Sequence, residues 1–293
     1  MNSKRTAYFS AIALGMAWFT ATPAQAQGPV FNFVGASNFI DFTTWDMYGS
    51  AYASNISSGS WNYSVLRLTA AGEGGQGGAA FAPSTVSLDF NAAFNISFDY
   101  YMVHGSVIPG DGMVFVLTAD NPMTVNGGGP LVPGGGSDLG YGGSGLTGLA
   151  FAIDTFNFNG EPVAPSIQIL QDGSTTPVAY TETGLTDMAD PSYYQWHTEL
   201  SYTPSGNSDM QGTLTGTITQ FIGNLSFSVS AGVDGSTLSG VPLYYGFTAG
   251  NGLADDGHYV SSAVPVPEPE TYAMLLAGLG LIGLRFRRST SIA

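Results

Sequence analysis

The 293-residue chain combines 41 glycines, no cysteine and a formal net charge of −15. So acidic a surface repels phosphate backbones and anionic lipid, which argues against nucleic acid as a partner. Because disulfides are excluded, an exported form of the chain must be held together by its core.

The N-terminus has the order of features that is typical of a secretory signal peptide. Lys4 and Arg5 precede the apolar run "AYFSAIALGMAWFTA", and "ATPAQA" then places small residues at Ala24 and Ala26. This pattern predicts a signal peptide over residues 1–26, removed after Ala26. An amphipathic first helix of the domain is the alternative.

The C-terminal tail, residues 265–293, is also distinctive. Val-Pro-Glu-Pro is followed by 14 apolar residues from Thr271 to Leu284, and then by Arg285, Arg287 and Arg288. A stable membrane span needs about 20 residues, and a basic cluster stays on the cytoplasmic side. The pattern therefore predicts a short C-terminal membrane helix.

This tail resembles the PEP-CTERM sorting signal of Gram-negative bacteria, over residues 266–288. The resemblance implies export, recognition by an exosortase-type membrane transpeptidase, and a destination at the cell surface or in the exopolysaccharide matrix. Contact with the membrane would occur only through the tail, before processing.

Between the two signals, residues 27–264 form the expected domain. They contain one arginine, Arg67, and 19 acidic residues, so the mature net charge is about −18. Apolar residues alternate with polar ones in "AFNISFDYYM", and period-two alternation predicts a half-buried strand. Gly, Asn, Pro and Ser separate further runs of this kind, such as "GMVFVLTA", "LAFAIDTF", "LSFSVSA" and "LYYGFTA". With no helical period, the domain is predicted to be an antiparallel β-sandwich.

Two glycine-rich stretches, residues 70–80 and 126–145, interrupt the strand pattern. Neither has the Gly-Lys-Ser/Thr ending of a phosphate-binding loop, and neither opens a helix. A flexible surface loop and a loop that shapes a ligand site both remain open for these stretches.

Four stretches in order resemble the legume-type (L-type) lectins: "SVLRLTAAGEGGQGGAAF", "GDGMVFVLTA", "GGGSDLGYGG" with "LAFAIDTF", and "VPLYYGFTAGNG". The resemblance spans roughly residues 30–263. It implies an all-β, antiparallel jelly-roll sandwich of the concanavalin-like type, and glycans or exopolysaccharide as partners.

The resemblance also implies a sugar site around Asp111, preceded by a cis peptide at Gly110–Asp111. A carboxylate accepts charge-assisted hydrogen bonds from vicinal sugar hydroxyls, backbone N–H groups of the glycine-rich loop would donate, and Phe156 would face the apolar side of the pyranose. A turn aspartate is the alternative reading of Asp111. The expected carbohydrate-binding residues are Asp111, Gly136, Ser137, Asp138, Phe156, Asn157, Asn159, Thr248, Ala249, Gly250 and Asn251.

The metal loop of the family is only half present. Ala152 stands where the resemblance places a glutamate, and Ser166 stands where it places a histidine, so a transition metal is not expected. Phe158 falls at the asparagine of the family pattern, and the loop is about two residues short. Oxygen ligands suited to calcium remain: Asp154, the Phe156 carbonyl, Asn157 or Asn159, and Glu161.

The sequence gives little support to catalysis. The related sandwich hydrolases place two glutamates along this strand, because retaining hydrolysis needs carboxyl groups about 5 Å apart, and "AIDTFN" has neither. No Gly-x-Ser-x-Gly elbow or cysteine nucleophile occurs. We therefore expect no enzyme but an exported lectin-like protein. The rival hypothesis is a structural matrix or surface protein that keeps the sandwich and binds no sugar.

Overall fold

The structure is a computed structural model that describes residues 30–32, 39–58, 61–105, 108–158, 160–189, 195–221, 223 and 225–265. The expected signal peptide, residues 1–26, and the expected membrane segment from Thr271 to Leu284 lie outside the described residues.

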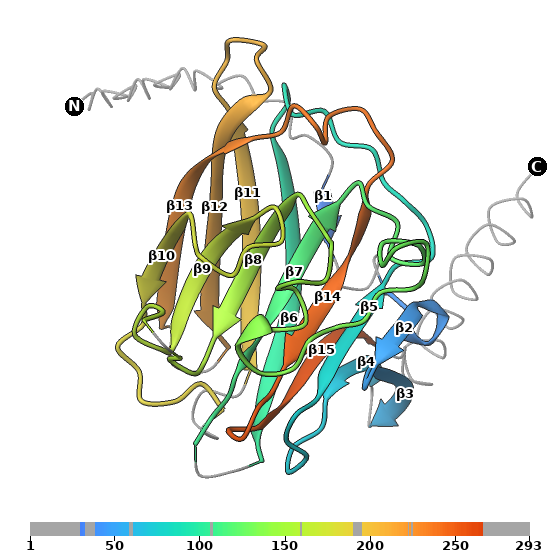
Figure 1. Ribbon diagram of the computed structural model, residues 1–293, viewed down its shortest axis with the longest axis vertical. Helices are drawn as coiled ribbons and strands as arrows, with labels where there is room; N and C mark the ends of the chain where they lie inside the picture. Colours follow the sequence, from blue (N-terminus) through green and yellow to red (C-terminus); the bar gives the residue numbers. More distant parts are fainter. Residues whose placement is uncertain are drawn as a thin grey trace, which may run out of the picture.

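The described chain forms two sheets stacked face to face (Figure 1). One is an eight-stranded sheet ordered β13-β12-β11-β6-β15-β4-β3, in which β1 also pairs with β6. Its strands are β1 (Val30–Asn32), β3 (Tyr52–Ser58), β4 (Trp61–Thr69), β6 (Phe94–His104), β11 (Gln195–Pro204), β12 (Gln211–Gln220), β13 (Ser226–Asp234) and β15 (Asp256–Pro265).

The second sheet has seven strands, ordered β10-β9-β8-β7-β14-β5-β2. These strands are β2 (Asp46–Gly49), β5 (Gly77–Phe81), β7 (Gly112–Thr118), β8 (Leu149–Asp154), β9 (Ser166–Gln171), β10 (Ala179–Glu182) and β14 (Tyr244–Gly250). Neighbours pair antiparallel throughout both sheets, apart from the parallel pair of β1 and β6. The predicted antiparallel sandwich is confirmed.

Helix is confined to two short 3₁₀ turns in the described part of the chain, η1 (Phe42–Thr44) and η2 (Gly136–Asp138). No helix in that part is long and apolar enough to cross a membrane.

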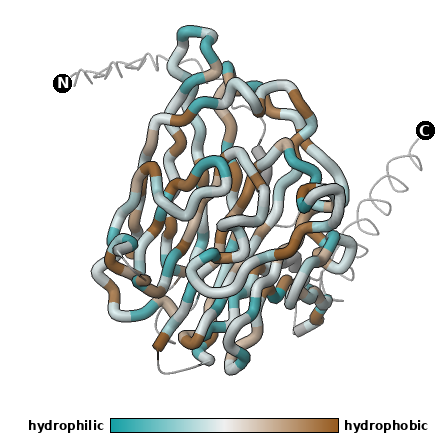
Figure 2. The backbone as a smooth tube through the Cα atoms, in the orientation of Figure 1, coloured by the Kyte–Doolittle hydropathy of each residue, from teal (hydrophilic) through white to brown (hydrophobic). Residues whose placement is uncertain are grey.

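The main core lies between the sheets. Phe98 of β6, Phe115 of β7 and Phe247 of β14 meet there, with ring centroids 4.9 to 5.6 Å apart. As the alternation in β6 predicts, Phe94, Ile96, Phe98, Tyr100 and Met102 face this core and are buried. Figure 2 shows hydrophobic residues interspersed with more hydrophilic ones along the backbone of the sandwich. Aromatic pairs of this kind add about 0.5–1.5 kcal/mol each to their area burial.

A second cluster covers the outer face of the seven-stranded sheet. The glycine-rich segment 126–145 folds over β7 and β8 and buries Leu139 and Tyr141 against Val114 and Ala152. Every residue of β7 and β8 is therefore buried. Leu131, Leu139 and Tyr141 thus pack this stretch against the sheet, whereas residues 126–128 are exposed.

Candidate functional site

Asp111 stands at the start of β7, where the chain enters the seven-stranded sheet. The Gly110–Asp111 peptide bond is cis, as expected. The Asp111 N–H donates to the Gly250 carbonyl at 3.1 Å, and the Asp111 carbonyl accepts from the Thr155 N–H at 2.8 Å. Asp111 is thus fixed between the ends of β14 and β8.

The residue after Asp111 must be glycine. Gly112 has φ +149°, and a Cβ atom there would lie 2.3 Å from the Ile153 carbonyl oxygen. A side chain would therefore push β7 away from β8. This explains the "GDG" pattern in structural terms.

The Asp111 side chain lines a pocket of about 350 Å³. The side chain is buried, and its Oδ2 atom has no hydrogen-bond partner in the described structure. Burial raises the pKa of Asp111 to about 6, the backbone N–H of Gly252 opposes the increase, and the charge of Glu161 adds to it. A buried carboxyl oxygen without a partner is costly unless a ligand satisfies it.

Five of the expected sugar-binding residues meet at this pocket: Asp111, Gly136, Ser137, Asp138 and Phe156. They come from three separate segments of the chain. The remaining wall comes from residues that the sequence did not single out in this role: Gly135, Phe158, Gly252, Leu253 and Ala254. Leu253 is fully exposed and Phe158 is 55% exposed. A bulky apolar side chain in a glycine-rich turn was the available signal for Leu253.

Four expected residues of the late segment do not line the pocket. Thr248 and Ala249 are buried within β14, and Gly250 ends that strand. The Thr248 hydroxyl donates to the Leu139 carbonyl at 2.8 Å, and the carbonyl of buried Asn251 accepts from the Gly136 N–H at 2.9 Å. These residues hold the glycine-rich loop that forms the pocket wall.

The segment after β8 is closed by its own hydrogen bonds. The amide of exposed Asn157 donates to the carbonyls of Glu161 and Pro162, both at 2.8 Å. Glu161 Oε2 accepts from the Phe158 N–H at 2.8 Å. Asn159, the alternative ligand, lies outside the described residues. Asn157 does not line the pocket.

An amide occupies the place at which the resemblance to the lectins puts a transition-metal site. Gln168 on β9 lies opposite Ala152. Its Nε2 atom donates to Asp154 Oδ2 at 2.7 Å and to Ser166 Oγ at 2.9 Å. An amide N–H group offers no lone pair to a metal, and it occupies the oxygens on this side of Asp154, so the residues present do not fit a transition metal.

The donor set does fit calcium in its chemistry, because it consists of oxygens. Burial raises the pKa of Asp154 to about 7, the Phe156 N–H opposes this, and the charges of Glu161 and Asp111 add to the increase. These carboxyl groups are therefore close enough to repel one another. Over the described residues, however, no group of three or more His, Cys, Asp or Glu side chains is close enough to hold a metal ion.

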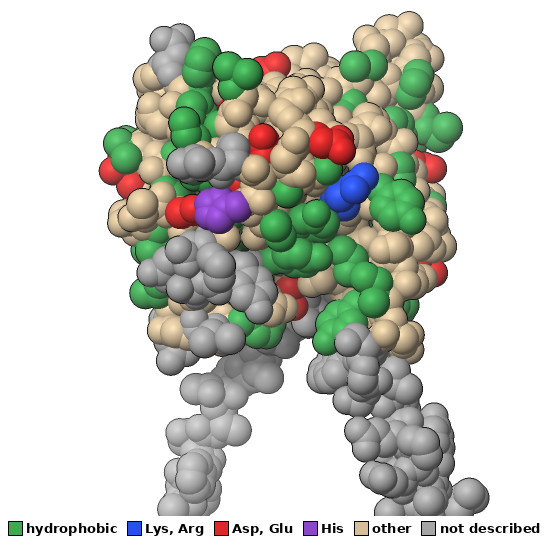
Figure 3. Space-filling model, turned by 90° about the horizontal axis from the view of Figure 1, so that it is seen from below, with side chains coloured by type: hydrophobic (Ala, Val, Ile, Leu, Met, Phe, Trp, Pro, Cys, Tyr) green, Lys and Arg blue, Asp and Glu red, His purple; other side chains and the backbone are tan. Residues whose placement is uncertain are grey.

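Figure 3 shows the end of the sandwich at which β6 and β14 finish, seen from below. Hydrophobic side chains gather there, with acidic side chains among them. Exposed apolar residues of this end include Val103, Ile108 and Leu253. The surface around the pocket is thus both acidic and apolar.

Both the C-terminal tail and the β-sandwich domain are similar to known proteins. Residues 265–289 match the PEP-CTERM protein-sorting motif. The expected sorting signal is confirmed, and it indicates export and sorting to the cell envelope. Among curated proteins, none matches the chain.

The domain is similar to solved lectin structures. The metal-free lectin I-B4 of Griffonia simplicifolia is 18% identical with a TM-score of 0.55, covering 75% of this chain and 93% of the lectin. The Bauhinia forficata lectin in complex with GalNAc is 19% identical with a TM-score of 0.57, covering 78% and 96%. Lectin I of Ulex europaeus, in complex with the methyl glycoside of α-L-fucose, is 21% identical with a TM-score of 0.55, covering 75% and 92%.

The domain therefore has the legume-lectin fold. The chain as a whole joins a legume-lectin-like sandwich to a PEP-CTERM sorting motif.

Proposed function

We propose that this protein is an exported lectin whose pocket at Asp111 binds a glycan or exopolysaccharide. The observation that carries the proposal is the unpartnered Asp111 Oδ2 atom, buried at the wall of an open pocket of about 350 Å³. A pair of sugar hydroxyls would satisfy this carboxylate through charge-assisted hydrogen bonds of about 1.5–3 kcal/mol each.

The other walls suit the apolar side of a pyranose. Phe156, Phe158 and Leu253 bring hydrocarbon to the pocket, whereas Gly136 and Gly252 bring backbone without side chains. Phe158 occupies the position at which the family pattern has an asparagine. We therefore propose a preference for sugars that combine a diol with an apolar edge, such as a deoxygenated or methylated carbon.

We propose binding and not catalysis. The residues that line the pocket include no histidine and no glutamate. Asp111 and Asp138 are the carboxyl groups of the wall, and they come from separate loops. Hydrolysis of a glycoside by the usual route requires a paired acid and base on both sides of the bond.

Calcium is proposed as a ligand of the segment that follows β8. Asp154, Glu161, Asn157 or Asn159 and the Phe156 carbonyl would hold the ion. Bound calcium would offset the burial and the repulsion among carboxyl groups that together raise the pKa of Asp154. It would also stabilise the wall that carries Phe156. No transition metal is proposed.

The destination of the protein is proposed to be the cell surface or the exopolysaccharide matrix of a Gram-negative bacterium. An exosortase-type transpeptidase would process the tail after the signal peptide has been removed. Intact-mass measurement of protein extracted from the surface should show that Arg285 to Ala293 are missing. A mass that still includes these residues would refute the processing step.

A structural matrix or surface protein that binds no sugar is the second candidate. The departures at Ala152, Ser166 and Phe158 favour it, because each removes a ligand of the family pattern. The two candidates differ in whether the pocket binds a sugar at all.

A glycan array of the exported protein, probed with and without millimolar calcium, tests the proposal. We expect binding to at least one class of glycan, and a loss of at least tenfold in Asp111→Asn, which corresponds to about 1.4 kcal/mol. Asp209→Asn, in the hairpin between β11 and β12, is the matched control and should bind as the wild type does. A wild type that binds no glycan under either condition would favour the structural protein.

A further inference from the structure

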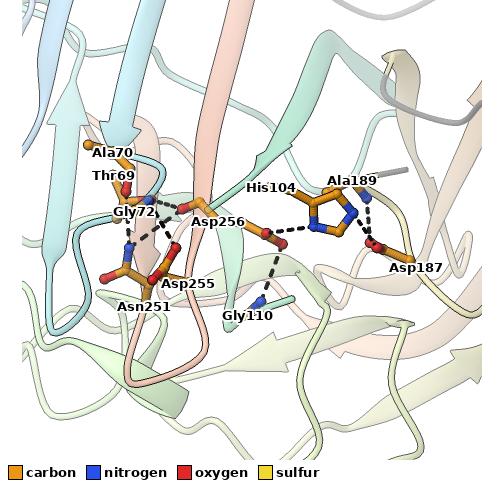
Figure 4. Close-up of polar contacts among 10 residues, drawn as sticks. All are labelled: Thr69, Ala70, Gly72, His104, Gly110, Asp187, Ala189, Asn251, Asp255 and Asp256. Carbon is orange, nitrogen blue, oxygen red and sulfur yellow. Dashed lines mark hydrogen bonds and ion pairs between the residues drawn. The ribbon is translucent and has the colours of Figure 1, made fainter. Parts of the chain in front are cut away.

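A second buried carboxyl group, that of Asp256, contacts the backbone next to Asp111. Asp256 opens β15 and is fully buried. Its Oδ2 atom accepts a hydrogen bond from the N–H of Gly110 at 3.2 Å, and Gly110 directly precedes Asp111 (Figure 4). Asp256 thus contacts the peptide backbone immediately before Asp111, the residue proposed to bind the sugar.

The other oxygen of Asp256 faces a histidine. Asp256 Oδ1 has no hydrogen-bond partner in the described structure and lies 3.6 Å from His104 Nδ1. His104 Nε2 lies 2.6 Å from Asp187 Oδ2, and Asp187 Oδ1 accepts from the Ala189 N–H at 2.8 Å. The His104 side chain is 38% exposed. A row of polar contacts therefore runs from solvent through His104 to Gly110 (Figure 4).

Acidic groups surround Asp256. Asp187 faces it through His104, and Asp255 precedes it, with Oδ1 accepting from the Gly72 N–H at 2.9 Å. His258, two residues further on, is fully buried against Thr69, and burial lowers its pKa to about 3, so it adds no positive charge. Within the described residues, Arg67 is the sole Lys or Arg, and its guanidinium lies over the Tyr52 ring.

These surroundings favour the neutral form of Asp256. Burial raises its pKa to about 8, the charges of Asp187 and Asp255 add to the increase, and the N–H groups of Gly110 and Gly105 oppose it. An ionised carboxylate here would be fully buried among other acidic groups, which is costly. A neutral carboxyl instead keeps one oxygen as the acceptor for Gly110 and directs its hydroxyl toward His104 Nδ1.

We propose that Asp256 and His104 are positioning residues for Asp111, and that glycan binding weakens when Asp256 loses its proton to solvent. This inference rests on the proposed function for its effect on sugar affinity. The contacts of Asp256 with His104 and with the Gly110 N–H belong to the fold, so they can be measured without a sugar.

The chain offers variants that separate the two protonation states. Asp256→Asn keeps an acceptor for Gly110 and a donor for His104, and it cannot ionise. His104→Ala removes the ring nitrogen that faces the Asp256 carboxyl group. Asp99→Asn is the matched control, because Asp99 Oδ1 lies 2.7 Å from Nδ1 of the 37% exposed His197, away from the pocket.

The first experiment follows the Gly110 amide resonance and the Asp256 carboxyl carbon by NMR between pH 5 and pH 10. In the wild type and in Asp99→Asn we expect both signals to titrate together near pH 8. In Asp256→Asn the Gly110 titration should disappear, and in His104→Ala its midpoint should fall. A Gly110 signal that stays flat to pH 10, or that titrates equally in Asp256→Asn, would overturn the inference. An unchanged midpoint of the Gly110 titration in His104→Ala would show that His104 is not a positioning residue.

The second experiment measures binding of free galactose, N-acetylgalactosamine and L-fucose by saturation-transfer NMR at pH 6.5 and pH 9.5. We expect any sugar bound by the wild type to bind at least fivefold more weakly at pH 9.5, and equally at both pH values in Asp256→Asn. Equal loss in both proteins would contradict the link to sugar affinity. If the wild type binds no sugar at either pH, the proposed function fails, and the Gly110 titration still decides the inference.

Discussion

The two ends of the sandwich place aspartates in opposite environments. At the hairpin end, Asp209 Oδ1 accepts from Ser205 Oγ at 2.7 Å and Asp234 Oδ1 accepts from the Ser236 N–H at 2.9 Å. These bonds lower the pKa of both exposed groups. At the pocket end, burial raises the pKa of Asp111, Asp154 and Asp256.

The opposite pKa changes at the two ends indicate which end of the sandwich is suited to bind a ligand. A carboxylate in a turn is satisfied by its neighbours in sequence, and it stabilises that turn. The three carboxyl groups at the pocket end are buried and lie near other acidic groups, so they oppose folding when they are ionised. Such an arrangement is expected where a cation or a set of hydroxyl groups completes the structure.

The largest expected effect is a loss of stability at alkaline pH. Because Asp111, Asp154 and Asp256 have a raised pKa in the folded state, their stabilising contribution is complete below the unfolded value of 3.8 and is lost as pH rises to about 8. In calcium-free buffer, we expect the melting temperature to be about 10 °C lower at pH 8.5 than at pH 5.

Calcium sharpens this prediction. Binding to the ionised Asp154 loop should recover part of the loss at pH 8.5, by about 2.7 kcal/mol at 100-fold the dissociation constant, and should have little effect at pH 5. Thermal melts at both pH values, with manganese as a control, measure it. A melting temperature that rises steadily from pH 5 to pH 8.5 without calcium would contradict the account.

A smaller effect is expected from the amide that occupies the place of a transition metal. Gln168→Leu leaves Asp154 Oδ2 buried without its donor, at a cost of about 1–3 kcal/mol. The melting temperature should fall by about 5 °C at pH 8 and by less at pH 5, where Asp154 is protonated. An equal fall at both pH values would indicate lost packing and not a lost hydrogen bond to the carboxylate.

The smallest effect is expected at the hairpin end. Asp209→Ala and Asp234→Ala remove turn hydrogen bonds at exposed positions, so the melting temperature should change by no more than about 2 °C. Because the pKa of both groups is lowered, the small loss should be present above pH 4 and vanish in more acidic buffer. A steep change in the pH profile between pH 5 and pH 8 would remove the contrast between the two ends.

The fold could be predicted from local patterns. Alternation in "AFNISFDYYM" reported the buried face of β6, and "GDGM" marked the turn into β7 because only glycine fits at Gly112. The resemblance of four stretches, in order, to the legume-type lectins implied that Asp111 lies beside the glycine-rich loop and Phe156. Such patterns are visible in the sequence because the local backbone conformation requires particular residue types, as it requires glycine at Gly112.

The supporting contacts could not be predicted in this way. Asp256 and His104 are 152 positions apart in the sequence, and neither lies in a motif. Thr248 and Asn251 lie in the expected segment but point into the protein, because the end of β14 is buried beneath the glycine-rich loop. The hydrogen bond from Gln168 to Asp154 could not be predicted either, because it follows from the strand register that places Gln168 opposite Ala152.

The most direct test of the central claim is chemical-shift mapping of the exported protein against the strongest glycan from the array. The account predicts shifts at the amides of Gly136, Ser137, Asp138, Phe156 and Leu253, with no shift at Asp209 or Asp234. In Asp111→Asn, the same shifts should be much smaller at the same glycan concentration. Shifts confined to other surfaces, or unchanged shifts in Asp111→Asn, would show that this pocket is not the sugar site.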